Sequence, residues 1–503
     1  MTFDVLDASI IAVIMLAVII VGTRGFKYSR SLVNYFLAGK ELGAIALAFS
    51  IMATYFSAAS FLGGGGATYL YNLGFGAWLT AWHIVGVVLM WILVAERLFR
   101  YASKTNIISI PDFIERRYES RAAKAVSAIV MMFLFTLYLT SVYKGGAIII
   151  ATFLNTSFEV GLMLLTIPVL VYIGLGGLRA AVLNNLLLGS LMLLAAFLAF
   201  GYIMSAVGGP LEGIKSLQEM TIMDKMPGSL WLKLNGAGPS RAMEIDMVPY
   251  LIMGVTFSIS MAQVALPSLL MQFYAAKNVK VIDGGRLLGP VLVAAYAIAV
   301  FSLGAFCHVI LDHQLTVSEV ARLMKDPDWV IPKTVSILAP SGVRGLILAA
   351  PVAASMSTLA VTLIVLSATL TRDVVQSLKP KVSEEKLVAL ARVVPIAFAV
   401  ISLLLTLIQE GIIVEIVAAA FGIIFVCFLG PITIGLYWRR ATKFGAIASM
   451  ISGLVIGLYW HLFLYKATYI HTVFPALAAS LLSFFLVSLL TKKPSSKALE
   501  PLG

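Results

Sequence analysis

Long apolar runs separated by short polar breaks recur along almost the whole chain. A helix needs about 20 apolar residues to cross the roughly 30 Å hydrocarbon core of a bilayer, and the runs have this length. An α-helix also satisfies its own backbone hydrogen bonds in lipid. The pattern therefore predicts thirteen crossings, near residues 8–23, 43–70, 75–95, 125–152, 159–178, 186–206, 248–275, 287–311, 344–371, 388–408, 412–438, 445–465 and 472–490.

The two ends of this pattern bear on topology. Asp4 and Asp7 precede the first run and Arg24 follows it, the reverse of a cleavable signal peptide with its basic start. The first run is therefore interpreted as a retained helix. The weakest break is at 409–411, where three residues separate two runs. An odd number of crossings places the two termini on opposite sides of the membrane.

Composition agrees with this pattern and excludes other classes of protein. Of the 503 residues, 60% are hydrophobic and only 12% are charged, and the mean hydropathy is +0.99. Soluble globular domains average about 25% charged residues, so a soluble enzyme is excluded. A transmembrane β-barrel would show alternating apolar and polar residues, whereas these runs are continuous. The predicted fold class is therefore an all-α integral membrane protein.

The positive charge lies mostly in short loops, and its distribution predicts the orientation. Cytoplasmic loops of membrane proteins are enriched in Lys and Arg. On one side of the predicted topology lie 26 of the 36 Lys and Arg residues, on the other side 9, and Lys144 lies inside a crossing. Several of the 9 fall in the two longest outer loops, 207–247 and 312–343. We expect a multi-pass protein of the cell membrane, with its N-terminus outside and its C-terminus in the cytoplasm.

Two crossings contain helix breakers in polar surroundings. The second has Ser57 and Ser60 and then four glycines, 63–66, and each glycine disfavours a helix by about 1 kcal/mol relative to alanine. The seventh has polar residues between 256 and 263, followed by Pro267. Two interpretations stay open for the glycines. They form a close-packing surface, or they mark a discontinuous helix whose free carbonyls bind an ion.

Five crossings separate the starts of the two interrupted segments. If crossings 2–6 (43–206) form one repeat and crossings 7–11 (248–438) a second, the odd number in each repeat inverts the second copy. Inverted repeats that meet at interrupted helices are typical of secondary transporters. We therefore expect one transmembrane transporter domain over 1–503, with 1–42 and 439–503 as peripheral helices and tails.

A group of neutral oxygens lies in the ninth crossing. Ser357 and Thr358, with the carbonyl of Ala354 one turn earlier, form a compact patch. Hydroxyls inside a helix usually bond to a carbonyl of the preceding turn, which is the simpler interpretation. Opposite an unwound helix, the same patch would suit a monovalent hard cation such as sodium, since hard cations prefer oxygen ligands.

Longer motifs resemble one family of membrane transporters. These are NYFLAGK at 34–40, ATYFSAASF at 53–61, YIGLGGLRAAVLN at 172–184, AAPVAASMST at 349–358 and GLYWR at 435–439. Together they resemble the sodium:solute symporters, and within them the pantothenate-transporting branch. The resemblance implies a LeuT-like five-plus-five inverted repeat with about 13 transmembrane helices.

The resemblance also implies a set of site residues. It assigns sodium to three backbone carbonyls and two hydroxyls, those of Ala53, Phe56, Ala354, Ser357 and Thr358. It assigns contacts with the solute to polar side chains of the two interrupted crossings, namely Tyr55, Ser57, Ser60 and Gln263.

Several positions depart from the family pattern. Asn185 stands where relatives commonly have an aspartate, and Ala360 and Val361 stand where relatives proposed to bind a second sodium have hydroxyls. We therefore expect one sodium site. Ser268 and Gln272 replace a histidine and an arginine of the pantothenate branch, which weakens the solute assignment more than the fold.

Lys144 lies inside a crossing, where a charge is costly and is a functional hypothesis by default. Three interpretations stay open: it attracts a solute carboxylate, it titrates as part of ion coupling, or it extends toward the interface. We include it among the solute contacts. His83, His308 and Glu415, in or at the ends of apolar runs, are interpreted as packing or boundary residues.

These observations predict a secondary transporter and not an enzyme, since no paired buried carboxylates, metal-ligand spacing or nucleotide motif is visible. We expect symport of sodium with a small organic carboxylate, first of all pantothenate, by alternating access. Sodium, the solute and the lipid bilayer are the expected partners, without nucleic acid or an obligate protein partner. Three alternatives stay open: a sodium symporter for another monocarboxylate, amino acid or sugar, a proton-coupled or sodium-independent transporter that uses Lys144, and a transporter-like sensor.

Overall fold

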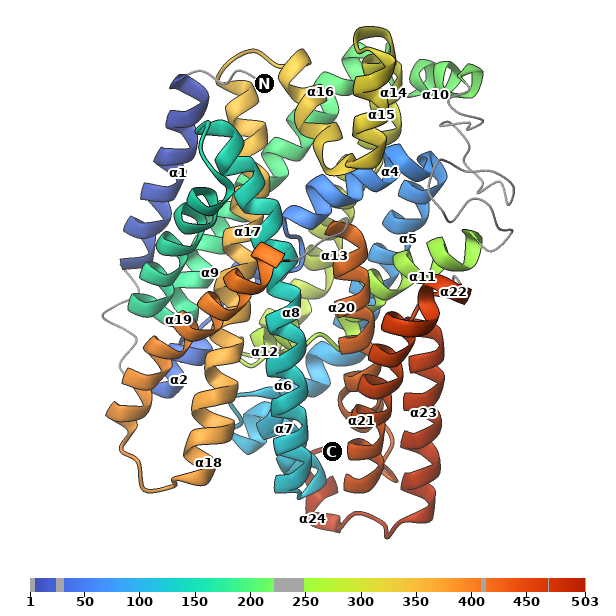
Figure 1. Ribbon diagram of the computed structural model, residues 1–503. Coiled ribbons are helices and arrows are strands. Elements are labelled where there is room, and N and C mark those ends of the chain that lie inside the picture. Colours follow the sequence, from blue (N-terminus) through green and yellow to red (C-terminus); the bar gives the residue numbers. More distant parts are fainter. Residues whose placement is uncertain (1–4, 24–30, 221–247, 409–412, 469, 503) are drawn as a thin grey trace.

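The computed structural model of the chain describes residues 5–23, 31–220, 248–408, 413–468 and 470–502 (Figure 1). Within these ranges the chain is almost entirely helical, and no β-strand forms. Part of the loop charge, at 24–30 and 221–247, and the weak break at 409–411 lie outside the described residues.

The predicted crossings coincide with long helices or with pairs of shorter ones. In chain order they are α1 (Val5–Thr23), α3 (Ala44–Tyr55) with α4 (Gly65–Tyr71), α5 (Leu73–Leu89), α8 (Arg121–Phe153), α9 (Phe158–Ala206), α11 (Val248–Met261) with α12 (Pro267–Phe273), α13 (Val279–Phe301) with α14 (Leu303–Gln314), α17 (Val343–Ala368), α19 (Glu384–Ile408), α20 (Ile413–Phe428), α21 (Lys443–Tyr459) and α23 (Val473–Leu490). Shorter helices connect them, among them α2 (Leu32–Leu37), α6 (Glu96–Thr105), α7 (Ile110–Tyr118) and α10 (Pro210–Glu219), and α24 (Ser496–Leu499) follows the last crossing.

Helix α9 contains two of the predicted crossings. Its 49 residues would extend over roughly 74 Å at 1.5 Å per residue, more than twice the hydrocarbon core. Gly177 interrupts it with φ 56° and ψ −147°. A Cβ atom there would lie 2.4 Å from the carbonyl oxygen of Tyr35, so only glycine fits. The crossings predicted at 159–178 and 186–206 are therefore joined by a sharp kink at a glycine.

The count of crossings agrees with the prediction. In the described part of the chain, 11 helices are long and apolar enough to cross a membrane, and the bent pair α3 and α4 is a twelfth. Counting the two halves of α9 separately gives thirteen. The start of α1 and the C-terminal α24 lie at opposite ends of the molecule (Figure 1), as an odd number requires. The all-α membrane fold is therefore confirmed.

One end of the molecule carries helices that the hydropathy pattern did not show. We call the end with α10, α15 and α16 the outer end, after the orientation predicted from the charges (Figure 1). The predicted loop at 312–343 contains α15 (Val317–Lys325), the turn η7 (Pro327–Trp329) and α16 (Val330–Leu338). We refer to residues 316–338 as the outer hairpin. Helices of nine residues are too short to give a membrane-type hydropathy signal.

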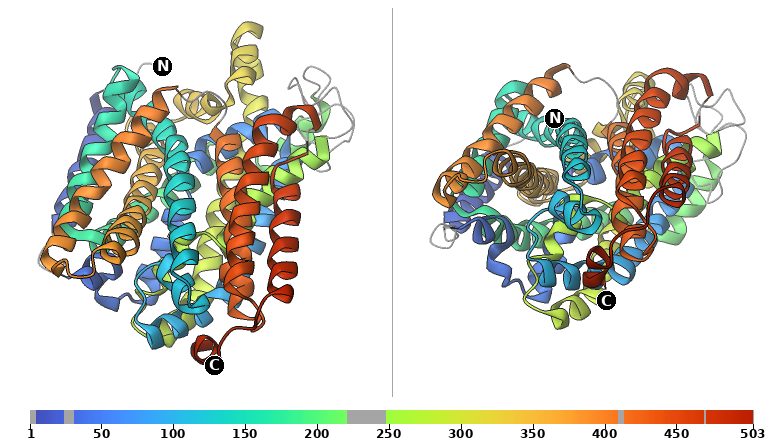
Figure 2. Two further views of the ribbon diagram at one scale, coloured as in Figure 1. Left: turned by 60° about the horizontal axis from the view of Figure 1, so that its bottom comes forward. Right: turned by 90° about the horizontal axis from the view of Figure 1, so that it is seen from below.

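The centre of the packing is α17, whose most apolar stretch is completely buried. It packs against α9 and α8, which also contact each other. In the view from below, α8 and α17 lie side by side (Figure 2). Helices α8 and α17 are therefore placed to line the interior.

At the opposite, inner end, a buried ion network joins three elements. Lys124 Nζ lies 2.6 Å from Asp112 Oδ1, 2.8 Å from Glu115 Oε2 and 3.4 Å from Asp373 Oδ1. Arg372 Nε lies 3.1 Å from the other oxygen of Asp112. Burial would raise the pKa of Asp112, but the charges of Lys124 and Arg372 outweigh it and hold the pKa below its usual value. The network connects α7 and α8 with η8 (Thr369–Val375), which follows α17.

Candidate functional site

Helix α3 ends at Tyr55, and the chain leaves helical geometry at Phe56, whose ψ is 121°. Ser57 supplies the local cause. Its carbonyl accepts a hydrogen bond from the Ser60 hydroxyl (2.6 Å), and its own hydroxyl accepts one from the Ala59 N–H (3.2 Å). Such local bonds compete with the helical ladder. The chain then resumes as η3 (Ala59–Gly64) and α4, bent by 60° from α3, and the break leaves carbonyls at the end of α3 free for other partners.

The glycine run itself is helical, because it closes η3 and begins α4. Its glycines allow close packing, two of them (Gly65 and Gly66) against the outer hairpin and the other two against α20 and Phe301. A Cβ atom on Gly66 would lie 2.3 Å from the carbonyl oxygen of Pro327, and one on Gly65 would lie 2.7 Å from Ile331 Cγ1. We call Gly63–Gly66 the glycine socket. Close packing therefore applies to the glycines, and the helix break lies just before the socket. That the carbonyls freed there bind an ion stays a prediction.

The carboxyl group of Asp328, next to Pro327 in the hairpin turn, is buried with 2% of the residue exposed. Its Oδ2 accepts a hydrogen bond from the Ile413 N–H (3.4 Å) at the start of α20. Burial raises the pKa of Asp328 to about 7, aided by the charge of Asp326 and opposed by that hydrogen bond and by Lys144. The outer hairpin thus joins the glycine socket to α20.

The second interrupted helix has a different cause. Helix α11 ends in a 3₁₀ turn, η6 (Ala262–Val264), and α12 begins at Pro267. Leu266 is extended (φ −78°, ψ 109°), because the residue before a proline avoids the helical region. Gln263 lies in the η6 turn, where its Nε2 donates to the carbonyls of His83 (3.1 Å) and Ser260 (3.0 Å).

The oxygens assigned to sodium come together where α17 passes the end of α3. The Ser357 hydroxyl donates to the carbonyl of Ala53, and it lies 2.9 Å from the carbonyl oxygen of Ala354. Its neighbour Thr358 lies with Oγ1 3.4 Å from the carbonyl oxygen of Phe56. Both carbonyls of α3 therefore face the two hydroxyls of α17.

The chemistry of this donor set fits a monovalent cation. Every predicted ligand residue is at most 1% exposed, and all of the donors are neutral oxygens. Hard cations prefer such ligands. The carbonyl of Thr54, 3.0 Å from Thr358 Oγ1, is one further oxygen that sequence reasoning missed, because a backbone carbonyl leaves no signal in a sequence.

A cavity of about 30 Å³ adjoins these oxygens. A water molecule occupies about 30 Å³ of the liquid, so the cavity has room for one or two waters and not for an organic solute. Its wall is mostly aromatic and apolar and has no charged side chain among the described residues, being formed by Tyr55, Phe56, Ser57, Ala59, Ser60, Gly64, Leu79, His83, Tyr138, Ile259, Phe301, Val414, Val417 and Phe421. The structure is therefore a closed conformation of this chamber.

The predicted solute contacts divide into two groups. Tyr55, Ser57 and Ser60 line the cavity. Gln263 does not, because its amide N–H groups bond to backbone as described above. Lys144 is half-buried on α8, also outside the cavity lining, and its charge acts on Asp328. The assignment of solute contacts stays a prediction.

His83 is a residue of the cavity wall that was interpreted from the sequence as packing. Its Nδ1 lies 2.6 Å from the carbonyl oxygen of Leu79 and 2.7 Å from Ser260 Oγ, and its ring stacks on Phe56 with centroids 5.8 Å apart. A lone histidine in an apolar run was the available signal. Its neighbours lie on other helices, so the sequence could not show that it faces a chamber.

Two of the departures from the family pattern meet in one buried network. Asn185 Nδ2 donates to Ser50 Oγ (3.1 Å) and to Thr54 Oγ1 (3.1 Å). Gln272 Nε2 donates to the same Thr54 hydroxyl (3.2 Å), and Ser50 donates to Gln272 Oε1 (2.6 Å). The network is neutral, and it joins α3 to α9 and to α12.

An all-helical membrane protein whose two interrupted helices lie beside a buried chamber and an adjoining cluster of neutral oxygens has the architecture of a secondary transporter. The model of the sodium:solute symporter family matches residues 35–453. The chain belongs to the sodium:solute symporter family, and it is a transporter and not an enzyme.

Known relatives agree with this assignment over nearly their whole lengths. The sodium/pantothenate symporter of Escherichia coli is 29% identical over 455 residues, which cover 90% of this chain and 89% of the relative. The osmoregulated proline transporter OpuE of Bacillus subtilis is 27% identical over 500 residues, covering 98% and 96%. The high-affinity proline transporter PutP of the same species is 28% identical, covering 95% and 96%.

A solved structure supports the fold. The chain is similar to a Na⁺-coupled sialic acid symporter in a substrate-bound outward-open state, with a TM-score of 0.80 and 17% identity over 98% of this chain and 100% of the other. The predicted LeuT-like fold is thereby confirmed. The exact repeat bounds, 43–206 and 248–438, stay a prediction.

Proposed function

We propose that this transporter couples the inward movement of one sodium ion to the uptake of a small organic carboxylate by alternating access. One observation supports the proposal most directly: the hydroxyls of α17 contact the freed carbonyls of α3. A sodium ion bound by Ala53, Phe56, Ala354, Ser357 and Thr358 would connect these two helices. The ion would then fix the interrupted segment beside the solute chamber.

The neutral site explains how the ion supplies energy. Because no carboxylate balances the sodium charge, its movement through the site is driven by the membrane potential, worth about 2.3 kcal/mol per charge per 100 mV. Sodium orders the end of α3 in the outward-open state, and solute then binds at Tyr55, Ser57 and Ser60. Closure at the outer hairpin precedes opening at the inner end, where low sodium favours release.

A carboxylate can bind in this chamber without a charged side chain. In transporters of this plan, the N-terminus of a half-helix faces the anionic group of the solute, and η3 begins directly at the chamber. The bound sodium adds a second positive charge. Pantothenate is our first candidate, because the Escherichia coli relative is named for it.

A second candidate solute is proline, a zwitterionic carboxylate. Two relatives that cover almost the whole chain are named as proline transporters. The small, largely aromatic wall of the chamber also suits a compact ring. Gln272 and Ser268, which replace the charged and histidine positions of the pantothenate branch, favour a solute other than pantothenate.

Uptake into proteoliposomes tests the proposal. Labelled pantothenate, proline and a sugar are each offered with an inward sodium gradient, with an inward proton gradient, and with neither. We expect sodium-driven accumulation of one carboxylate. Accumulation driven by protons alone would contradict sodium coupling, and accumulation of the sugar alone would contradict the carboxylate.

The variant Lys144→Met tests the alternative use of Lys144. Because Lys144 is not part of the chamber wall, we expect the solute KM to change less than twofold. A KM raised tenfold or more would instead make Lys144 the partner of the carboxylate.

A further inference from the structure

A second, larger cavity of about 370 Å³ opens at the outer end of the molecule. Ligand sites of small molecules occupy roughly 300–1,000 Å³, so this cavity could hold a solute that the closed chamber excludes. Its wall is the outer hairpin together with Thr152 at the end of α8. The hairpin residues are Glu319, Arg322, Leu323, Asp326, Trp329 and Lys333, and Leu315, directly before the hairpin, completes the wall.

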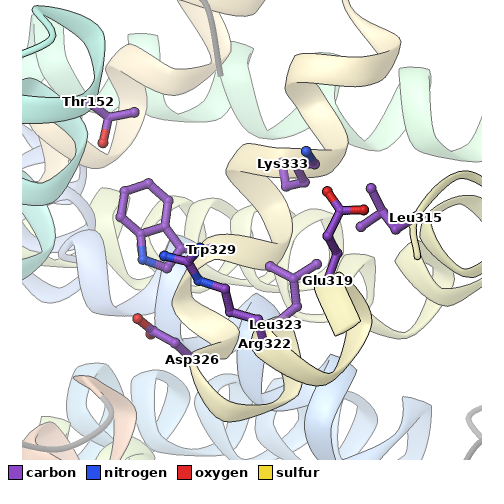
Figure 3. Close-up of a pocket in the computed structure, with 8 residues that line it drawn as sticks. All are labelled: Thr152, Leu315, Glu319, Arg322, Leu323, Asp326, Trp329 and Lys333. Atoms are coloured by element: carbon purple, nitrogen blue, oxygen red, sulfur yellow. The ribbon is translucent and has the colours of Figure 1, made fainter. Parts of the chain in front are cut away.

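The side chains of this cavity combine an aromatic wall with two cations. The indole of Trp329 and the side chain of Arg322 point the same way, toward Thr152 (Figure 3). Arg322 and Lys333 form no ion pair with any residue in the described ranges. Both are therefore available to an anion, and Trp329 with the two leucines offers an apolar surface beside them.

Of the two acidic side chains in the wall, Glu319 already accepts hydrogen bonds within the protein. The Glu319 carboxylate accepts hydrogen bonds from the N–H (3.0 Å) and the hydroxyl (2.9 Å) of Thr316, as the capping box of α15. These bonds, with the nearby charge of Lys333, hold the pKa of Glu319 below its usual value. Asp326 is the other acid, and it would accept an ammonium group but not a second carboxylate. The wall therefore suits a carboxylate with an apolar body, with or without an amino group.

The cavity and the seal over the chamber share one turn of the chain. Trp329 faces the outer cavity, while Pro327 and Asp328, directly before it, contact the glycine socket and α20. We infer that the outer hairpin holds a first binding site for the carboxylate solute, bound by Arg322 and Lys333 against Trp329. The identification of this ligand with the transported solute rests on the proposed function.

Direct binding to the purified full chain in sodium-free buffer tests this inference. Proline and the potassium salt of pantothenate are titrated while tryptophan emission is recorded, and their methyl esters serve as probes that lack the carboxylate. We expect saturable quenching by an acid, absent in Trp329→Phe. Arg322→Gln and Lys333→Gln should each weaken binding at least fivefold. Lys325 lies on α15 like Arg322 but outside the cavity lining, so Lys325→Gln should change the binding affinity less than twofold.

Two results would overturn the inference. One is equal quenching by the acid and its methyl ester, and the other is unchanged binding in the Arg322→Gln, Lys333→Gln double variant. In transport, the double variant should raise the KM of uptake at least fivefold with little change in kcat. If proteoliposomes accumulate no carboxylate and quenching still follows the pattern above, the proposed function fails and the outer site stands.

Discussion

A single residue, Thr54 at the end of the first interrupted helix, connects the proposed sodium ligands on α17 to α9 and to the second interrupted helix. Its carbonyl accepts a hydrogen bond from Thr358 on α17, and its hydroxyl accepts bonds from Asn185 on α9 and Gln272 on α12. Each buried hydrogen bond contributes about 0.5–1.5 kcal/mol, and leaving a buried donor unpaired costs more. If ion binding moves the C-terminal end of α3, these hydrogen bonds would therefore transmit the movement to α12.

The first residue-level prediction concerns the ion ligands. Ser357→Ala removes one oxygen from the proposed sodium site, and we expect the sodium concentration for half-maximal uptake to rise at least tenfold. Ser355→Ala is the matched control, because the Ser355 hydroxyl bonds to the carbonyl of Val142 (3.1 Å), away from α3. Equal sodium dependence in the two variants, measured in proteoliposomes, would remove Ser357 from the site.

At the scale of secondary-structure elements, the outer seal depends on the close approach of η7 to α4. Gly66→Ala places a methyl group against the carbonyl of Pro327, and overpacking of this kind costs about 1–3 kcal/mol. Closure should become unfavourable, so we expect the uptake rate to fall five- to 100-fold while solute binding persists.

The control for this variant is Gly201→Ala, in the same helical context but with no atom within 4 Å of the added Cβ. A helical glycine-to-alanine change in open space is stabilising by up to about 1 kcal/mol, so uptake should be normal. If Gly66→Ala transports at the control rate, the socket does not need to close tightly.

The buried carboxyl of Asp328 makes the same seal sensitive to pH. In the closed conformation its pKa is about 7, against 3.8 for the exposed group. The closed form therefore binds a proton that the open form lacks, and between these values each unit of falling pH favours closure by up to about tenfold. Above pH 7 the balance should be constant. Asp326, Lys144 and Glu415 are the other charged groups that act on Asp328.

Cysteine labelling measures this balance. In the variant Ser60→Cys, the introduced side chain takes the place of Ser60 in the chamber wall. The native cysteines, Cys307 and Cys427, are buried. We expect the reaction of the introduced cysteine with an external thiol reagent, taken relative to the reaction of a free thiol at the same pH, to slow from pH 7 to pH 5. In Asp328→Asn the reaction should be slow throughout, because the neutral amide removes the need for a proton. Equal pH dependence with and without Asp328 would assign the effect to another group.

At the scale of the whole molecule, the two ends are closed by different interactions. Packing against glycines closes the outer end, whereas Lys124, Asp112 and Asp373 form a buried ion network at the inner end. Breaking a buried ion pair by removing one partner costs about 3–5 kcal/mol. We therefore expect Lys124→Met to lower the thermal unfolding midpoint by several degrees. Lys104→Met should unfold like the unchanged protein, because among the described residues the amine of Lys104 has only a surface carbonyl, that of Pro501, as its hydrogen-bond partner (3.5 Å).

The sequence predicted what depends on long periodic signals and missed what depends on tertiary contacts. Runs of apolar residues were sufficient for all thirteen crossings, and Pro267 was sufficient for the second interruption. The outer hairpin was missed, since its helices are short and amphipathic. Asp328 and Lys124 were also missed, because the burial that gives them significance comes from helices far away in the sequence. The glycines were recognised as unusual, but only the neighbouring hairpin explains them.

The chamber of about 30 Å³ has a consequence for the resting cell. In the alternating-access cycle proposed above, the unloaded protein has room to carry only one or two water molecules as it reverses its orientation. The empty step of the cycle should therefore transfer almost no dissolved salt. A membrane that contains many copies of this protein would therefore stay electrically insulating. The sodium gradient across it would be dissipated only by completed transport cycles.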